Sequence, residues 1–132
     1  MAKTLKNTFC FCGSTKIYEQ CCAPFHFGLK NAQTAEELMR SRYSAYVQKL
    51  DQYIQKTWHP SSRPVVIENA EPHLKWLGLT IVQTYSCSDT EAYVEFVACY
   101  RVGGGPAQKM QELSRFVYEQ EQWFYIDGSF VE

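Results

Sequence analysis

The spacing of hydrophobic residues changes once along this chain, from a helical period to a strand period. After Thr34 the apolar residues lie on one continuous arc when the sequence is projected at ~100° per residue. Thr34 and Glu37 occupy the two positions of a capping box, so we predict that the helix begins at Thr34. The arc consists of Ala35, Leu38, Met39, Tyr43, Tyr46 and Leu50, and Ser41, Ser44 and Gln48 lie opposite it.

A second helical stretch follows directly. Leu50, Tyr53, Ile54, Thr57 and Trp58 again recur at helical spacing. His59 precedes Pro60, and the residue before a proline is disfavoured in helical geometry. We therefore expect this helix to end at His59-Pro60.

From Trp76 onwards apolar and polar residues alternate, which is typical of β-strands. Predicted turns lie at Ser88-Asp89-Thr90, at the glycine run 103–106 and at Gln120-Glu121. Helices followed by a strand meander predict an α+β fold, with the helices packed on one face of a curved antiparallel sheet. The predicted strands are 76–82, 92–102, 113–119 and 123–128.

The length of 132 residues suits one domain with a small appendage. We expect a small unit over residues 1–29 and a main domain over 30–132. No run of ~18 apolar residues is present to cross a bilayer. The start lacks a secretory leader, so we expect a cytoplasmic location.

Four of the six cysteines, Cys10, Cys12, Cys21 and Cys22, lie close together near the start. A reducing compartment disfavours disulfides and favours metal ligation by clustered thiols. Two close pairs separated by a short loop can converge on one tetrahedral ion, which indicates Zn²⁺. Because four cysteines fill the coordination sphere, such a site is structural.

Alternatives to this metal site remain open at the level of sequence. The thiols could be free and buried, or redox active, and His26 could replace one ligand. Cys99, within a predicted strand, and Cys87, at a strand end, are expected to be unreactive. The aromatic residues Phe9, Phe11, Phe25 and Phe27 are expected to dock the small unit on the main domain.

Arg42 falls inside the apolar arc, where its guanidinium needs a partner. One interpretation is a buried ion pair with Asp127 or Glu95. The other is a pocket that binds an anionic ligand. His59 or Asp127 could act there as a base, but no catalytic residue is assigned. The candidate pocket residues are Arg42, Tyr43, Tyr46, Trp58, His59, Trp76, Arg115 and Asp127.

The pattern Cys-x-Cys, eight residues, Cys-Cys resembles the SEC-C zinc motif. Six further blocks resemble the YchJ family. The resemblance implies a SEC-C unit fused to a cone-shaped domain similar to nuclear transport factor 2, ketosteroid isomerase and SnoaL-like proteins. It implies no particular activity. The blocks are Leu38–Tyr46, Thr57–Ser61, Trp76–Leu79, Val94–Phe96, Ser114–Val117 and Trp123–Gly128.

Two functions follow as hypotheses. In the first, the zinc unit contacts a macromolecular partner, as the SEC-C motif does in the preprotein-translocase ATPase. The lysines of residues 1–33 make this unit mildly basic, but they are too sparse to indicate nucleic acid. In the second, the cone cavity around Arg42 binds a small molecule, as an isomerase, a dehydratase or a binding protein would.

Overall fold

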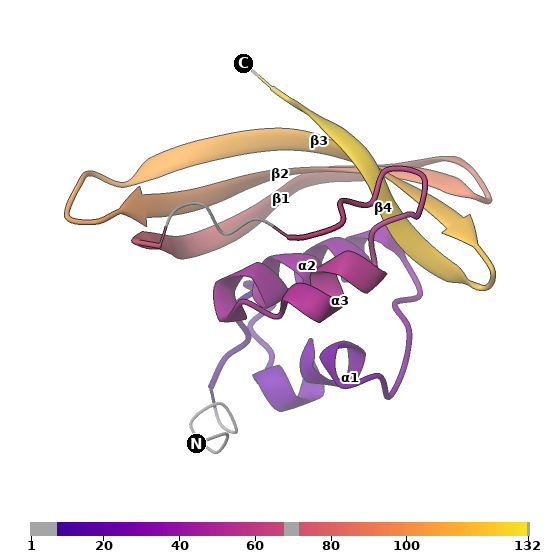
Figure 1. Cartoon of the computed structure of the whole chain (residues 1–132), viewed down its shortest axis with the longest axis horizontal. Helices are drawn as coiled ribbons and strands as arrows, with labels where there is room; N and C mark the ends of the chain where they lie inside the picture. The colour runs from indigo at the N-terminus through magenta and orange to yellow at the C-terminus, as the bar shows by residue number, and fades with distance from the viewer. Residues whose placement is uncertain (1–7, 68–71, 132) are drawn as a thin grey trace.

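The computed structural model describes residues 8–67 and 72–131 and has three layers (Figure 1). A four-stranded antiparallel sheet in the order β1-β2-β3-β4 forms the first layer. Helices α2 (Ala35–Gln48) and α3 (Asp51–Lys56) pack on one face of it. The third layer is the cysteine unit, residues 8–29, which contains η2 (Tyr18–Gln20) and α1 (Ala23–His26). The predicted α+β architecture is confirmed.

The strands occur in the predicted order but reach further than predicted. They are β1 (Leu74–Ser88), β2 (Glu91–Val102), β3 (Gln108–Glu119) and β4 (Gln122–Phe130). The polar end of β1 pairs with β2 although its own alternation is weak, as in the pair Ser86 and Ala92. Gln120 and Glu121 both have positive φ, which is the geometry of a two-residue hairpin turn.

Helix α2 begins as predicted. The Glu37 amide donates to Thr34 Oγ1 at 3.1 Å. The Glu37 carboxylate accepts from the amide of Gln33 at 2.8 Å and not from that of Thr34, so the return bond of the capping box lies one residue earlier. The second helix ends at Lys56, and Trp58 forms an isolated bridge with Tyr125 of β4.

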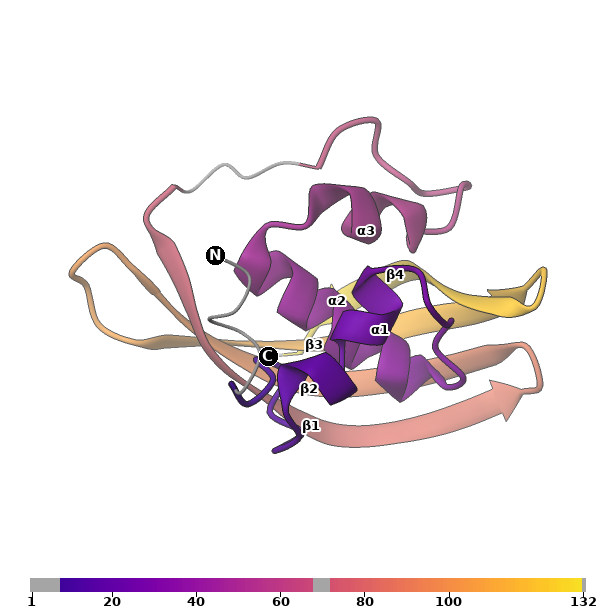
Figure 2. The same ribbon diagram turned by 90° about the horizontal axis from the view of Figure 1, so that it is seen from below.

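Helix α2 is covered on both faces. Its apolar arc packs on the inward residues of the sheet, such as Val94, Phe96 and Phe116. The opposite face carries Ser41 and Ser44, yet both are 0% exposed because the cysteine unit lies on them. Figure 2 shows α1 in front of α2 in the view from below. The helical period alone predicted only the face toward the sheet.

Two of the four aromatic residues expected to dock the cysteine unit do so. Phe25 belongs to the main core and Phe11 packs against it. Phe9 and Phe27 are each 69% exposed, so the prediction was wrong for these two. Alternation of aromatic residues does not specify which of them face the main domain. The division of the chain at residue 30 stays a prediction.

In the part of the chain that the structure describes, no helix combines the length and apolar character needed to cross a membrane.

Candidate metal centre and ligand pocket

The four clustered cysteines bring their sulfur atoms together. The Sγ atoms of Cys10, Cys12, Cys21 and Cys22 all lie within 4.8 Å of one another. Cys12 Sγ is 3.6 Å from Cys21 Sγ, and Cys21 Sγ is 4.0 Å from Cys22 Sγ. A tetrahedral ion with bonds of about 2.3 Å separates its sulfur ligands by about 3.8 Å. The cluster therefore has the dimensions of a four-thiolate metal site.

The first cysteine pair is held by a tight turn. The amide of Cys10 donates to Lys16 O at 2.7 Å, and that of Gly13 donates to Cys10 O at 3.3 Å. Gly13 has a φ of 80°, and a Cβ there would lie 3.1 Å from Leu79 O of β1. Glycine is thus needed both for the turn and for the close approach to the sheet.

The second pair and helix α2 complete the support of the site. The amide of Cys21 donates to Tyr18 O, and Cys22 precedes α1. From α2, Arg40 Nη1 donates to Cys12 O at 2.7 Å. Ser14 Oγ lies 3.0 Å from Cys21 Sγ, where its hydroxyl can donate to a thiolate.

The pKa values of the clustered thiols favour the binding of a cation. Hydrogen bonds from the thiols of Cys10 and Cys22 hold the pKa of Cys12 far below its usual value. The hydrogen bond with Cys12 raises the pKa of Cys10 to about 11, and hydrogen bonds to Cys10 and Cys12, with burial, raise the pKa of Cys22. These thiols cannot all ionise side by side without a compensating positive charge. A divalent cation held by the four sulfur atoms would provide that charge.

His26 does not join the cluster. Its Nδ1 lies 2.7 Å from Tyr18 OH and its Nε2 lies 2.8 Å from Ser41 O. Because a carbonyl only accepts, Nε2 carries the proton and Nδ1 accepts from the tyrosine. Burial lowers the pKa of His26, in keeping with a neutral ring. The alternative of His26 as a ligand is wrong for this structure; its ring joins the cysteine unit to α2.

A pocket of about 250 Å³ lies between α2 and the sheet, on the other side of α2 from the cysteines. Its walls are mainly aromatic rings and two methionines. From the sheet register, Ala98 and Met110 mark one end, Phe96 and Glu112 the middle, and Ser114 the other end. The lining is Met39, Arg42, Tyr43, Tyr46, Trp58, Trp76, Phe96, Ala98, Met110, Glu112, Ser114 and Tyr125.

Arg42 lines this pocket and is 4% exposed. Its Nη1 donates to Ile54 O at 2.8 Å and to Thr57 Oγ1 at 2.7 Å. The guanidinium lies over the rings of Trp58 and Tyr125, at 5.1 and 4.7 Å from their centroids. Burial lowers the pKa of Arg42.

The predicted ion pair of Arg42 with Asp127 or Glu95 is wrong. Asp127 pairs with Arg115 at 2.7 Å, and Glu95 accepts from Gln83 and Gln111. Both acids project from the sheet face opposite Arg42. Glu95 does so because it alternates with the inward residues Val94 and Phe96. Asp127 would share the inward face of Tyr125 by alternation, but a register shift between β3 and β4 at this point turns it outward. A carbonyl, a hydroxyl and two aromatic rings take the place of a carboxylate around Arg42.

Glu112 is the acidic residue of the pocket lining. Its Oε2 accepts from Ser114 Oγ at 3.1 Å and from Tyr125 OH at 3.2 Å. A Cβ on Gly128 would lie 2.0 Å from this oxygen. Gly128 thus leaves the space that the carboxylate occupies. Burial, followed by the charge of Glu112, raises the pKa of Tyr125, so its hydroxyl stays a donor.

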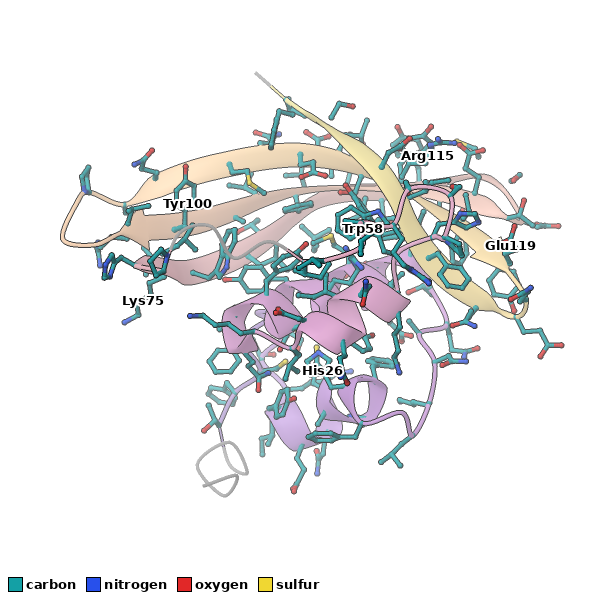
Figure 3. The ribbon with its side chains drawn as sticks, in the orientation of Figure 1. His26, Trp58, Lys75, Tyr100, Arg115 and Glu119 are labelled. Atoms are coloured by element: carbon teal, nitrogen blue, oxygen red, sulfur yellow. The ribbon has the colours of Figure 1, made fainter. Side chains whose placement is uncertain are left out.

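Five of the eight candidate pocket residues line the pocket, namely Arg42, Tyr43, Tyr46, Trp58 and Trp76. His59, Arg115 and Asp127 do not. His59 Nε2 lies 2.9 Å from Glu119 Oε1, beside the β3–β4 turn. Arg115 lies on the side of the sheet away from the helices (Figure 3), and it forms a salt bridge with Asp127, its partner on β4. His59 and Asp127 therefore lie too far outside this pocket to act as a base on a molecule bound in it.

Sequence reasoning missed the pocket residues of the later strands, above all Glu112. The signal was present, because Met110, Glu112, Ser114 and Phe116 occupy alternate positions and therefore share one face. It was overlooked because the predicted strand began at Leu113, after the acid.

The sequence model for the "YchJ, middle NTF2-like domain" matches residues 34–128. That span is most of the chain. The chain belongs to the YchJ family. A UPF0225 protein of Bordetella pertussis is 46% identical over 121 residues, which cover 90% of each chain. One from Xanthomonas oryzae pv. oryzae is 43% identical over 129 residues, covering 97% of this chain and 99% of that relative.

A solved structure is similar to this YchJ-family fold over nearly its whole length. The solution structure of a SEC-C motif containing protein from Rhodopseudomonas palustris superposes with a TM-score of 0.85 at 34% identity. The match covers 93% of this chain and 98% of that one. The predicted family and fold are thus confirmed.

Proposed function

We propose that this YchJ-family chain binds a small molecule in the pocket around Arg42, which we call the Arg42 pocket. The observation that supports the proposal is a buried guanidinium in the wall of an open space. Among the described residues, no carboxylate forms a salt bridge with Arg42. Glu112 lines the same pocket and its charge acts on Arg42, but the two do not form a salt bridge. A buried positive charge without a direct ion pair favours a ligand group that accepts hydrogen bonds.

The shape and lining of the Arg42 pocket restrict the ligand. A volume of about 250 Å³ corresponds to that of about eight liquid water molecules, so the ligand is small. The end near Trp76, Ala98 and Met110 is apolar, and the end near Arg42 and Ser114 is polar. We therefore propose a compact ligand with a ring or short alkyl body and a carboxylate or carbonyl head.

Benzoate, benzamide and benzamidine test this proposal, because they share a ring and differ in charge. We expect benzoate to shift the indole signals of Trp58 and Trp76 in NMR spectra. Benzamide should bind with lower affinity, and benzamidine should cause no shift. Tighter binding of benzamidine would contradict the role of Arg42 and point to Glu112 instead.

A pair of variants on β2 provides the control for that titration. Ala98→Leu adds bulk inside the Arg42 pocket, whereas Val97→Leu adds bulk on the opposite face of the same strand. Benzoate binding should be lost in the first and kept in the second, with both chains folded by circular dichroism. Equal binding to both variants would place the probe elsewhere.

For the cysteine cluster we propose Zn²⁺ as the bound ion. An all-thiolate tetrahedral set suits zinc, which such sites hold as a closed structural ion. Elemental analysis of protein purified without added metal should give about one zinc per chain. Cys21→Ser should lower that content, while Cys87→Ser, outside the cluster, should not. A stoichiometric content of iron would contradict the assignment.

A second function, partner contact through the cysteine unit, is favoured by one observation. Phe27 and Leu29 are 69% and 78% exposed on this unit. We propose that they contact a macromolecule in the cytoplasm, where the thiols remain reduced. Chemical cross-linking in cells should join this chain to its partner, and Phe27→Ser with Leu29→Ser should abolish that cross-linked product. Val65→Ser, at an exposed apolar residue of the main domain, should not; equal loss in both would contradict the proposal.

A further inference from the structure

A groove of about 320 Å³, separate from the Arg42 pocket, lies at the seam between the cysteine unit and the main domain. It is bordered by the segment before α2, the end of α3 with the loop after it, and the β3–β4 hairpin. Figures 1 and 2 both show these segments on one side of α2. We call this surface the seam groove. The polar residues that line it and carry the argument are Lys30, Asn31, Lys56, Arg63, Gln120 and Gln122.

The charges of the seam groove have one sign. Lys30, Lys56 and Arg63 come from three separate segments, and its lining contains no aspartate or glutamate. In residues 8–67 and 72–131, none of the three cations forms a salt bridge. Two acids of the β3–β4 hairpin, Glu119 and Glu121, are adjacent in sequence to lining residues but lie outside the lining, and Glu119 is paired with His59. The chain as a whole has a net charge of −1, so this concentration of positive charge is local.

Contacts with the protein hold the three cations near the groove. Lys30 Nζ lies 5.2 Å from the centroid of the Phe25 ring, and Lys56 Nζ lies 5.6 Å from that of Tyr53. Arg63 donates through Nε to Trp58 O at 2.9 Å and through Nη2 to Lys56 O at 3.4 Å. Its remaining N–H groups can donate to a ligand carboxylate.

The rest of the lining suits an extended peptide. Asn31, Gln120 and Gln122 have side-chain amides, and each offers both a donor and an acceptor, as a peptide backbone requires. Rings of Phe25 and Trp123 provide apolar walls. The lining contains no glycine-rich loop of backbone amides that would cradle a compact phosphate.

We propose that the seam groove binds an acidic segment of a partner protein. The inference rests on the second proposed function, partner contact through the cysteine unit, and it names the surface and the chemistry of the partner. Because Phe25 of the cysteine unit lines the groove and Lys30 directly follows that unit, the surface is complete only when the unit is docked.

Fluorescence anisotropy of a labelled octaglutamate peptide tests the inference on the metal-loaded full chain. We expect saturable binding that weakens as salt is added. Lys56→Glu with Arg63→Glu should weaken it about tenfold or more, because like charges then face the peptide. Lys75→Glu, a single charge reversal far from the groove, is the control, since Lys75 is exposed and lies at the opposite end of the sheet from Glu119 (Figure 3). The affinity of the Lys75→Glu variant for the peptide should stay within about twofold of that of the wild type.

Three results would overturn the inference. They are no saturable binding at low salt, an equal loss in Lys75→Glu, and tighter binding of a thymidine octanucleotide than of the peptide. If the peptide fails to bind while Phe27→Ser with Leu29→Ser still abolishes the cellular cross-link, the seam groove is excluded and partner contact is retained.

Discussion

At the residue scale, Gly128 and Glu112 show how a residue without a side chain can position a charged one. The carboxylate of Glu112 fills the space beside the Gly128 backbone and there accepts from Ser114 and Tyr125. The acid of the Arg42 pocket is therefore fixed by three neighbours on β3 and β4, and two of them are distant from it in sequence.

Gly128→Ala should displace that carboxylate. The new methyl group would stand 2.0 Å from Glu112 Oε2, so the side chain must turn away and lose both hydrogen bonds. We expect a loss of about 1–3 kcal/mol in the free energy of unfolding, measured by urea titration. In a Glu112→Ala background the same change should cost less, because the clash is absent. A purely additive double-mutant cycle would refute this coupling.

Arg42 stabilises the fold as well as lining its pocket. Arg42→Met keeps the length of the side chain but leaves Ile54 O without this donor and removes the charge from between two rings. We expect the free energy of unfolding to fall by about 1–3 kcal/mol. Arg63→Met provides a comparison with an exposed arginine that also donates to carbonyls, and it should cost less than about 1 kcal/mol. An equal cost for the two would argue against the special position of Arg42.

At the element scale, a helical wheel predicts the burial of only one of the two buried faces of α2. Its apolar arc correctly predicted the face toward the sheet, and with it the buried position of Arg42. The burial of Ser41 and Ser44 could not be predicted, because a hydroxyl satisfied by a neighbouring element has the same sequence signal as a solvated one. Ser41 Oγ pairs with Tyr53 OH at 2.7 Å and with Leu38 O at 2.8 Å.

The joint between α1 and α2 depends on His26. His26→Phe keeps a ring against Tyr53 but leaves Tyr18 OH and Ser41 O without the histidine. We expect the cysteine unit to be less stable by about 1–3 kcal/mol, seen as faster exchange of the hydrogen-bonded amides of Cys21 and Phe27. Gln20→Ala, at an exposed residue of the same unit, should leave exchange unchanged. Unchanged exchange in His26→Phe would show that metal and packing alone fix the joint.

At the scale of the whole molecule, periodicity and spacing predicted the layers and the cysteine cluster, because both depend on patterns local in sequence. The pocket was predicted less well. Trp58 and Trp76 were found from their aromatic character, whereas Glu112 and Tyr125 reach the same space through strand register, and register depends on pairing between distant segments. Asp127 was misplaced for the same reason, because a register shift between Tyr125 and Asp127 exchanges the two faces of β4. Arg115 lies between the inward residues Ser114 and Phe116, so alternation alone would have placed it on the outer face.

Removal of a bound metal ion should destabilise the cysteine unit and leave the sheet folded. A bound ion stabilises by about 4 kcal/mol when its free concentration exceeds Kd a thousandfold, and chelation removes that term. We expect a chelator to abolish amide protection in the cysteine unit and to weaken it at Ser41 and Ser44, which the unit covers. Amides of β2 and β3 should remain protected. Simultaneous loss throughout the sheet would mean that the layers unfold as one.

The double coverage of α2 makes this helix a partition about 10–12 Å thick, with sulfur atoms on one side and the Arg42 pocket on the other. Cobalt(II) favours the same tetrahedral thiolate geometry as zinc and is paramagnetic. In a cobalt-substituted chain, any molecule in the pocket would therefore lie within range of pseudocontact shifts. Cobalt at the cysteine cluster would in that way act as an intrinsic paramagnetic probe. It would report the position and orientation of a ligand that lies on the other side of α2.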